Sequence, residues 1–349
     1  MSPVRFPSFT AFAAALFAVA FLFGGVAPSR AQEDSTLAQT QAQDFVKCGV
    51  TQGLPGFSNT DDAGNWSGLD VDVCRAVAAA VLGDAEKVRY VPTSGKDRFT
   101  ALQSGEIDIL SRVTTWTMHR DTAIGMVFAG VNYYDGQGFM VRESLGVSSA
   151  LELDGASICT NAASTSELNV ADYFRVNGMA YEVVPFEKTD EVVAAYASGR
   201  CDVYTTDQAG LYANRLKFAD PLAHVVLPEV ISKEPLGPSV RVGDEQWLAI
   251  VRWSLFAMVN AEELGVTSAN VDAMRDSGDP AMERLLGLQG DYGENLGISN
   301  EWGYQIVKQV GNYGESFARN LGPETPLRIS RGLNALWSDG GILYAPPIR

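Results

Sequence analysis

Apolar positions recur along the chain at two spacings, and their order predicts strands that alternate with helices. Asp44–Gly53 holds a short apolar run before a glycine-containing loop, which indicates a strand, and Gly68–Gly83 has the spacing of an amphipathic helix that stops at a glycine. Glu86–Ser94 has the pattern of the next strand. The same order recurs at Gly155–Phe174 and Tyr181–Lys188. Such alternation predicts an α/β fold with mostly parallel sheets flanked by helices.

Two segments, one in each half of this pattern, resemble each other. Arg98–Arg112 and Val192–Asp207 each contain a helix-like apolar spacing, a Ser-Gly pair, an aspartate and a short strand. Gly105 and Gly199 fit the position after a helix where a left-handed residue is needed. Chance similarity between two helix–turn–strand units is the alternative. The repetition indicates two lobes, each built on its own sheet.

Two extended segments connect the expected lobes. Gly136–Ser144 leaves the first lobe and Val230–Gly243 returns to it, and both contain glycine, proline or extended patterns. Two such crossings form a hinge with a cleft between the lobes. The alternative is two ordinary loops within one larger domain. The expected bounds are 41–138 plus 238–349 for lobe I, which includes a C-terminal helical extension, and 142–231 for lobe II.

The amino-acid composition and net charge limit the kinds of molecule that this protein could bind. The chain has 349 residues, of which 46% are hydrophobic and 19% charged, a globular composition that is long enough for two domains. The 42 acidic residues exceed the 26 basic ones, and the formal net charge is −16. This balance argues against nucleic acid and anionic membrane surfaces as partners, since both require exposed Lys/Arg. Solubility is the ordinary reason for such acidity.

Residues 1–31 have the pattern of a cleavable secretory signal. Arg5 gives a short basic start, a long apolar run follows, and Ser29 and Ala31 are small residues that suit a cleavage site. A retained membrane anchor is the alternative, because an apolar run of roughly 18 residues can span a bilayer. No cysteine lies near this site, so a lipid anchor is not expected. We therefore expect the mature chain to be exported.

Export permits disulfides, and the chain has four cysteines. They form no CxxC motif, and the two histidines, His119 and His224, lie far apart in sequence, so neither a zinc site nor another metal or cofactor is expected. Three pairings are open to four cysteines. Pairing within each lobe is the economical choice, because crossed pairing would join the lobes covalently. The expected bridges are Cys48–Cys74 and Cys159–Cys201.

The strand ends supply the candidate chemistry, because ligands of open α/β sheets bind outside the carboxyl ends of the strands. Arg120 follows the hydroxyl-rich end of one strand, and an arginine matches a carboxylate bidentately. Free N–H groups at the helix start after Asn161 add an anion cradle. Asp207 ends a strand of the other lobe and suits an ammonium group. Together these groups predict a site for a zwitterion, an α-amino acid.

Each of these residues also has a structural interpretation. Arg120 and Asp121 form a surface ion pair in one alternative, worth about 0–1 kcal/mol. Asp207 is a helix N-cap in another, and Trp66 and Trp116 are core residues rather than walls of the site. Catalytic motifs are weak: the chain has no nucleophile elbow, no P-loop and no dinucleotide fingerprint. An enzyme could still use a carboxylate base in the cleft.

Several motifs are more specific than the fold-level pattern. They are RFTALQSGEIDILSR, TTWTMHRDTA, YYDGQGFMV, GRCDVYTTDQ, ISKEPLGPSVR, GNYGESFARN, RGLNALW and YAPP. With them the chain resembles, from about Phe45 to its end, the polar amino acid-binding proteins of ABC importers (solute-binding protein family 3), and within them the general L-amino acid subgroup of Gram-negative bacteria. The resemblance implies a two-lobed type 2 periplasmic binding protein fold and a monomeric, non-enzymatic periplasmic protein. It also implies capture of L-amino acids and delivery to inner-membrane ABC permease subunits.

The resemblance also implies residue roles. Arg120 with Thr115 holds the ligand carboxylate, Asp207 holds the α-ammonium, and the loop from Thr51 to Leu54 lines the side-chain pocket. The full set of expected ligand-binding residues is Arg120, Thr115, Asp207, Ser164, Thr165, Asn161, Thr51, Leu54 and Val113.

This chain also departs from the family pattern. Many relatives have an aspartate in place of Thr51 and an aromatic residue in place of Leu54, so a neutral, less aromatic pocket with broad specificity is expected. The long segment after Glu262 is expected to pack on lobe I without chemistry of its own. A dehydratase-like cleft enzyme and a ligand sensor for a membrane receptor are the alternative functions.

Overall fold

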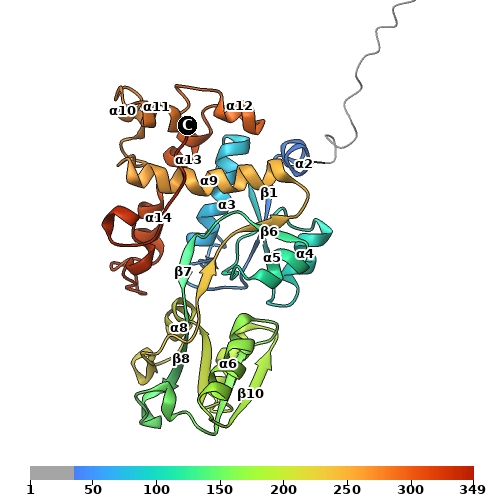
Figure 1. Ribbon diagram of the computed structural model, residues 1–349, viewed down its shortest axis with the longest axis vertical. Coiled ribbons are helices and arrows are strands. Elements are labelled where there is room, and N and C mark those ends of the chain that lie inside the picture. The colour runs from blue at the N-terminus through green and yellow to red at the C-terminus, as the bar shows by residue number, and fades with distance from the viewer. Residues whose placement is uncertain (1–34) are drawn as a thin grey trace, which may run out of the picture.

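The computed structural model describes residues 35–349, so the expected signal peptide lies outside the described residues. Two α/β lobes follow one another along the long axis of the molecule (Figure 1). In the described part of the chain, no helix has the length and apolar character needed to cross a membrane.

Each lobe contains one five-stranded sheet. The first sheet has the order β4-β1-β5-β14-β6 and the second β10-β9-β11-β8-β12. Strands β1, β4 and β5 are parallel, as are β9, β10 and β11, and the remaining strand pairs are antiparallel. The bounds are β1 Val46–Val50, β4 Val88–Pro92, β5 Ile109–Leu110, β6 Met126–Phe128, β14 Ser239–Arg241, β8 Gln137–Arg142, β9 Ala156–Asn161, β10 Tyr181–Phe186, β11 Val203–Asp207 and β12 His224–Val226. The mostly parallel two-lobed α/β fold is confirmed.

The repeated helix–strand unit is present in both lobes. Helix α4 (Arg98–Ser104) ends at Gly105, whose φ is 78°, and β5 follows. Helix α7 (Thr189–Ala197) is followed by Gly199 with φ 79° and then by β11. Glycine adopts this left-handed backbone without the steric cost of a Cβ atom, which is why both units turn at the same point. The other helices near the cleft are α3 Leu69–Leu82, α5 Met118–Ala123, α6 Thr165–Val176 and α8 Gln208–Arg215.

The hinge consists of β7 (Tyr133–Asp135) and β13 (Glu234–Leu236), which pair antiparallel between the lobes. The outgoing crossing therefore lies just before the expected segment Gly136–Ser144, because β8 already belongs to the second sheet from Gln137 onward. A Cβ atom on Gly136 would lie 2.2 Å from Cγ1 of Val230. This glycine thus marks the close approach of the two connecting segments, and not the start of the crossing.

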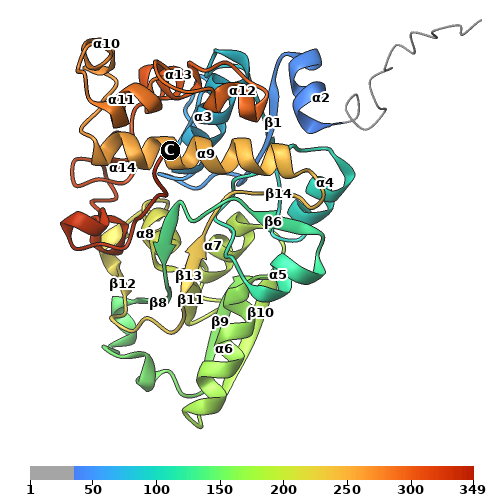
Figure 2. The ribbon, with the colours of Figure 1, turned by 45° about the horizontal axis from the view of Figure 1, so that its top comes forward.

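The C-terminal segment packs on lobe I, as expected, and also reaches the hinge. Helix α9 (Glu245–Glu263) lies across the first lobe beside α13 (Trp302–Gln309), and α14 (Tyr313–Asn320) packs against α3 and α9 (Figure 2). Ser316 Oγ donates to the buried Asp72 carboxylate of α3. Asn334 pairs with both the backbone N–H and the carbonyl of hinge residue Tyr134, at 2.7 and 3.0 Å. The extension therefore supports the hinge from one side.

Both expected disulfides are present. Cys48 of β1 is bonded to Cys74 of α3, and Cys159 of β9 is bonded to Cys201 just before β11. All four cysteines are fully buried. Each bridge lies within one lobe, so the lobes stay connected through the hinge and their mutual contacts.

Candidate functional site

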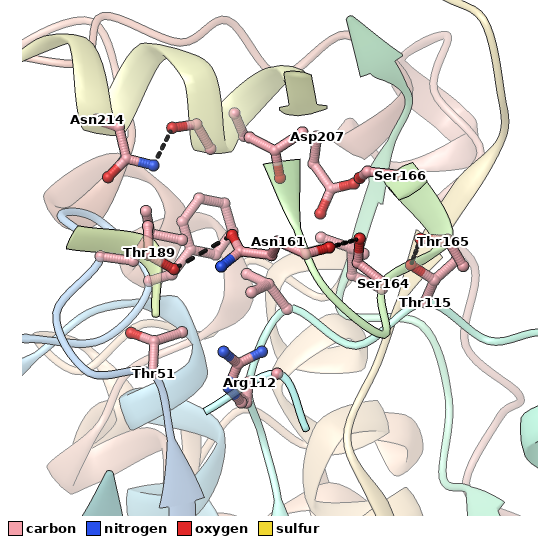
Figure 3. Close-up of a pocket in the computed structure, with 18 of the residues that line it drawn as sticks. Thr51, Arg112, Thr115, Asn161, Ser164, Thr165, Ser166, Thr189, Asp207 and Asn214 are labelled. Atoms are coloured by element: carbon pink, nitrogen blue, oxygen red, sulfur yellow. Dashed lines mark hydrogen bonds between the residues drawn. The ribbon is translucent and has the colours of Figure 1, made fainter. Parts of the chain in front are cut away.

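A cavity lies between the lobes, at the carboxyl ends of strands from both sheets (Figure 3). The loop after β1 and the segment after β5 line it from lobe I, and the start of α6, the end of β11 and the start of α8 line it from lobe II. All nine candidate residues line this cavity: Thr51, Leu54, Val113, Thr115, Arg120, Asn161, Ser164, Thr165 and Asp207. Neither Trp66 nor Trp116 belongs to the lining; they pack near Tyr90 and Phe128.

Arg120 is buried at the cleft and is not part of a surface ion pair. Thr117 caps α5 by accepting a hydrogen bond from the Arg120 backbone N–H, and Arg120 Nη1 donates to the Thr115 carbonyl at 2.9 Å. Its guanidinium lies 5.4 Å from the centre of the Phe99 ring. Burial lowers the pKa of Arg120, while the Glu234 and Asp207 carboxylates act in the opposite direction. The guanidinium is thus fixed in place with donors left for an anion.

Asp207 is the last residue of β11 and faces the same cavity from lobe II. It occupies the N-cap position of α8, but its side chain makes no capping hydrogen bond. Burial raises the pKa of Asp207 well above its usual value, and the carboxylates of Asp135 and Glu234 add to the rise. A buried carboxylate of this kind gains most from a cationic partner. The structure therefore favours the ammonium-receptor interpretation over the capping one.

The start of α6 supplies polar groups on the lobe II side. Ser164 caps the helix by accepting from the Glu167 N–H at 3.2 Å, and its hydroxyl donates to the Asn161 carbonyl at 2.6 Å. Asn161 Nδ2 is buried and has no hydrogen-bond partner in residues 35–349. Ala163 has φ 56°, which lets the chain turn tightly into the helix. An unpaired amide donor beside a helix start is suited to an acceptor group of a ligand.

On the lobe I side, Thr51 serves mainly to shape its own loop. Its hydroxyl lies 2.7 Å from Ser58 Oγ and donates to the Ser58 carbonyl at 3.0 Å. Val113 has φ 39°, and its N–H donates to the Asp70 carboxylate at 2.9 Å. These residues therefore contribute walls to the cavity, with their polar groups already in use.

Two arginines in the lining were missed by the sequence interpretation. Arg98 and Arg112 line the cavity and are buried, with 3% and 8% of their surface exposed. The expectation of a neutral pocket is therefore wrong, because it considered only the loop from Thr51 to Leu54. The strand-end argument that selected Thr115 applies equally to Arg112, which lies two residues after the end of β5.

Glu234 and Asp135, on the paired hinge strands, were missed as well. The Glu234 carboxylate accepts hydrogen bonds from Thr115 Oγ1 at 2.6 Å and from Thr165 Oγ1 at 3.0 Å, which belong to different lobes. Asp135 accepts from the N–H groups of Gly136 and Ala209, and burial raises its pKa to about 7. No local sequence signal identifies either residue, since both gain their surroundings only when the hinge strands pair.

Charged and polar side chains from both lobes line the cavity. In the described range, no group of three or more His, Cys, Asp or Glu side chains is arranged to hold a metal ion. Neither histidine lines the cavity. The Arg120 guanidinium on lobe I and the Asp207 carboxylate on lobe II, with hydroxyl and amide groups between them, form complementary charges for a small dipolar ligand.

Comparison with known proteins agrees with this geometry. The model of the family described as bacterial extracellular solute-binding proteins, family 3, matches residues 46–269. The chain is 59% identical to the general L-amino acid-binding periplasmic protein AapJ of Rhizobium johnstonii, over 90% of this chain and 93% of that protein. It is 50% identical to the glutamate/glutamine/aspartate/asparagine-binding protein BztA of Rhodobacter capsulatus, over 95% and 97%. A solved ABC transporter periplasmic binding protein from Brucella ovis with glutathione bound is 55% identical, with a TM-score of 0.88 over 90% of this chain and 99% of that one.

Proposed function

The chain belongs to family 3 of the bacterial extracellular solute-binding proteins, and we propose that it captures L-amino acids in the periplasm and delivers them to an inner-membrane ABC permease. The observation that carries this proposal is the placement of two opposite charges, the buried Arg120 and the half-buried Asp207, on the two sides of one cavity. Residues 1–31 act in this proposal as the secretory signal that is removed on export.

The two charges fit the two ends of an α-amino acid. The Arg120 guanidinium receives the α-carboxylate, with Thr115 beside it, and the Asp207 carboxylate receives the α-ammonium. Each buried charge is costly while it is unpaired, and a zwitterion compensates both at once. The helix start at Ser164 and Thr165 adds donors to the carboxylate side.

The relatives support an α-amino acid as the common ligand element. Their names record L-amino acids in general, and glutamate, glutamine, aspartate and asparagine. Glutathione, which is bound to the Brucella ovis protein, carries an α-amino and an α-carboxylate group at its glutamyl end. A site that recognises this head group accepts ligands of different length beyond it.

Delivery requires that the lobes close on the ligand, and the lobes already touch across the cleft. Lys217 Nζ of lobe II donates to the Gly53 carbonyl of lobe I at 2.9 Å, and the hydroxyls of Thr115 and Thr165 are 3.4 Å apart. Closure of the two lobes about the hinge removes water from the charge pairs and strengthens them. The permease then recognises the closed form, and the ligand leaves the protein chemically unchanged.

The test is calorimetric titration of the chain from Gln32, freed of carried-over ligand by unfolding and refolding, with L- and D-amino acids. We expect stoichiometric binding of L-amino acids. Arg120→Ala should weaken the affinity for L-amino acids by about 30- to 5,000-fold. This corresponds to a loss of about 2–5 kcal/mol of binding free energy, because the ligand carboxylate is then buried without a partner.

Asp207→Ala should also abolish tight binding, whereas Arg89→Ala, which removes an exposed arginine of lobe I, should not. Unchanged affinity in Arg120→Ala, or binding of dicarboxylates that lack an amino group, would contradict the zwitterion site. Recovery of a chemically altered ligand would instead favour the dehydratase-like alternative.

A further inference from the structure

Three arginines of lobe I bring more positive charge to the cavity than one α-carboxylate can contact, although the lining also contains the carboxylates of Asp135, Asp190 and Asp207. Arg98, Arg112 and Arg120 all line the cavity, and none of them forms an ion pair with a carboxylate in the part of the chain that the structure describes. Arg120 is assigned to the α-carboxylate. Two buried guanidinium groups then remain without a counter-ion in contact.

The hydrogen bonds of these two arginines are incomplete. Arg112 donates through Nε to the Thr93 carbonyl at 3.1 Å, and within residues 35–349 its two terminal nitrogens have no hydrogen bond. Arg98 reaches Thr114 Oγ1 at 3.4 Å, and its buried Nε has no partner in the same residues. A guanidinium offers five donors, and buried donors are normally paired. Both side chains therefore keep donors for a group that enters the cavity.

Arg112 points into the cavity at a place separate from the head-group site. Figure 3 shows its two terminal nitrogens directed toward Asn161, with Thr51 on one side, whereas Thr115 and Thr165 lie together at another edge. An α-amino acid held at Thr115 and Asp207 thus has its side chain free to extend toward Arg112. This is where an acidic side chain would end.

The carboxylates near Arg98 and Arg112 act on them only from a distance. Asp70 is the carboxylate that most favours the charged form of Arg112, but it already accepts from Val113 N–H, Asn132 Nδ2 and Ser111 Oγ. Burial lowers the pKa of Arg112 to about 10 despite Asp70, and Arg120 adds to the decrease. Burial and the charges of Arg112 and Arg120 also lower the pKa of Arg98, while the Asp207 carboxylate acts in the opposite direction. The cluster remains a set of mutually repelling cations.

We propose that Arg112 and Arg98 form an anion subsite for a second carboxylate, so that the preferred substrates are α-amino acids with an acidic side chain. The subsite rests on the proposed zwitterion site, to which it adds specificity. A guanidinium pairs bidentately with a carboxylate, whereas a neutral amide of the same shape receives no charge compensation. Neutral amino acids still bind through the head group, but less tightly.

L-Glutamate and L-glutamine test the subsite, because they have nearly the same shape and differ in one charge. We expect the wild-type chain to bind L-glutamate more tightly than L-glutamine in calorimetric titration. Arg112→Gln should weaken L-glutamate binding by about 10- to 100-fold, the range for a lost hydrogen bond to a charged group. Binding of L-glutamine should change by no more than about threefold, and Arg112→Lys, which keeps the charge, should retain most of the preference. Arg89→Gln is the matched control, with the same charge change at an exposed position of lobe I.

The outcomes separate the subsite from the zwitterion site. Equal affinities of the wild-type chain for the two ligands, or equal losses for both in Arg112→Gln, would overturn the subsite while binding that depends on Arg120 persists. If the wild-type chain binds neither ligand, the proposed function itself fails. The wild-type comparison decides the matter even if Arg112→Gln does not fold.

Discussion

Glu234 is the residue through which the hinge holds both lobes, and its replacement by glutamine should loosen that connection. Only 1% of its surface is exposed. Its Oε2 accepts from Thr115 of lobe I and Thr165 of lobe II, and its Oε1 accepts from Asn169 Nδ2 at 2.8 Å and Ser232 Oγ at 2.5 Å. Four donors from three parts of the chain therefore meet at one carboxylate.

The size of the expected destabilisation depends on which of the four hydrogen bonds a glutamine side chain can still form. Asn169 Nδ2 can only donate, so the glutamine carbonyl must take the place of Oε1 and its NH₂ group the place of Oε2. The hydroxyls of Thr115 and Thr165 must then turn and accept. All four contacts survive in this arrangement, but as neutral hydrogen bonds of about 0.5–1.5 kcal/mol instead of charge-assisted ones of about 1.5–3 kcal/mol. We expect Glu234→Gln to lower the free energy of unfolding by about 2–4 kcal/mol.

The assay is urea unfolding of the ligand-free chain, followed by tryptophan fluorescence. Glu187→Gln is the control, because Glu187 also links the lobes, through Lys96 Nζ at 3.0 Å, but both side chains are exposed. Such a pair contributes about 0–1 kcal/mol. Thr165→Val in the Glu234→Gln background should show non-additive losses, since the two residues share a bond. A free energy of unfolding within about 0.5 kcal/mol of wild type for Glu234→Gln would show that this carboxylate does not hold the lobes together.

Three further predictions concern the disulfide of lobe II, the contact of the C-terminal segment with the hinge, and the release of a proton from Asp207 on ligand binding. The double variant Cys159→Ser/Cys201→Ser opens a loop of 42 residues, so it should lose about 4 kcal/mol of unfolding free energy in the same urea assay. Asn334→Ala removes both hydrogen bonds to Tyr134, so the free energy of unfolding should fall by about 1–3 kcal/mol and the melting temperature measured by calorimetry should fall with it. An unchanged melting temperature would mean that the extension does not stabilise the hinge. Because the pKa of Asp207 is raised in the ligand-free cleft and a bound ammonium lowers it, binding should release protons and affinity should rise with pH through the raised pKa. Titrations in buffers of different ionisation enthalpy measure this release, and its persistence in Asp207→Asn would contradict the assignment.

Much of the fold could be predicted because its signals are local. The turns at Gly105 and Gly199 depend on the backbone of one residue, and the strand and helix spacings depend on neighbours within one or two turns. The pairing of Cys48 with Cys74 followed from their places in one repeat. The hinge was placed slightly late, since Gly136 looks like a boundary in sequence although its role is to let Val230 approach.

The candidate site could be predicted only where a residue stands at a strand end that the sequence itself reveals. Asp207 ends β11, Thr115 lies in the segment after β5, and Arg120 lies in helix α5 just beyond it; the structure brings all three to one cavity. Arg112 lies close to a strand end too, but it was not selected. Arg98 begins a helix, a position where an arginine is ordinarily solvated.

Local patterns in the sequence were enough to predict the two α/β lobes, the bridges within them and the opposite charges of Arg120 and Asp207. The burial of Glu234 opposite Asp135, and the meeting of three arginines in one cavity, arise only when the chain has folded. The physical reason is the range of the interactions. Helix and strand patterns are set by near neighbours, whereas burial and charge coupling depend on residues such as Asn169 and Glu234, which are 65 positions apart and meet only after the hinge strands pair.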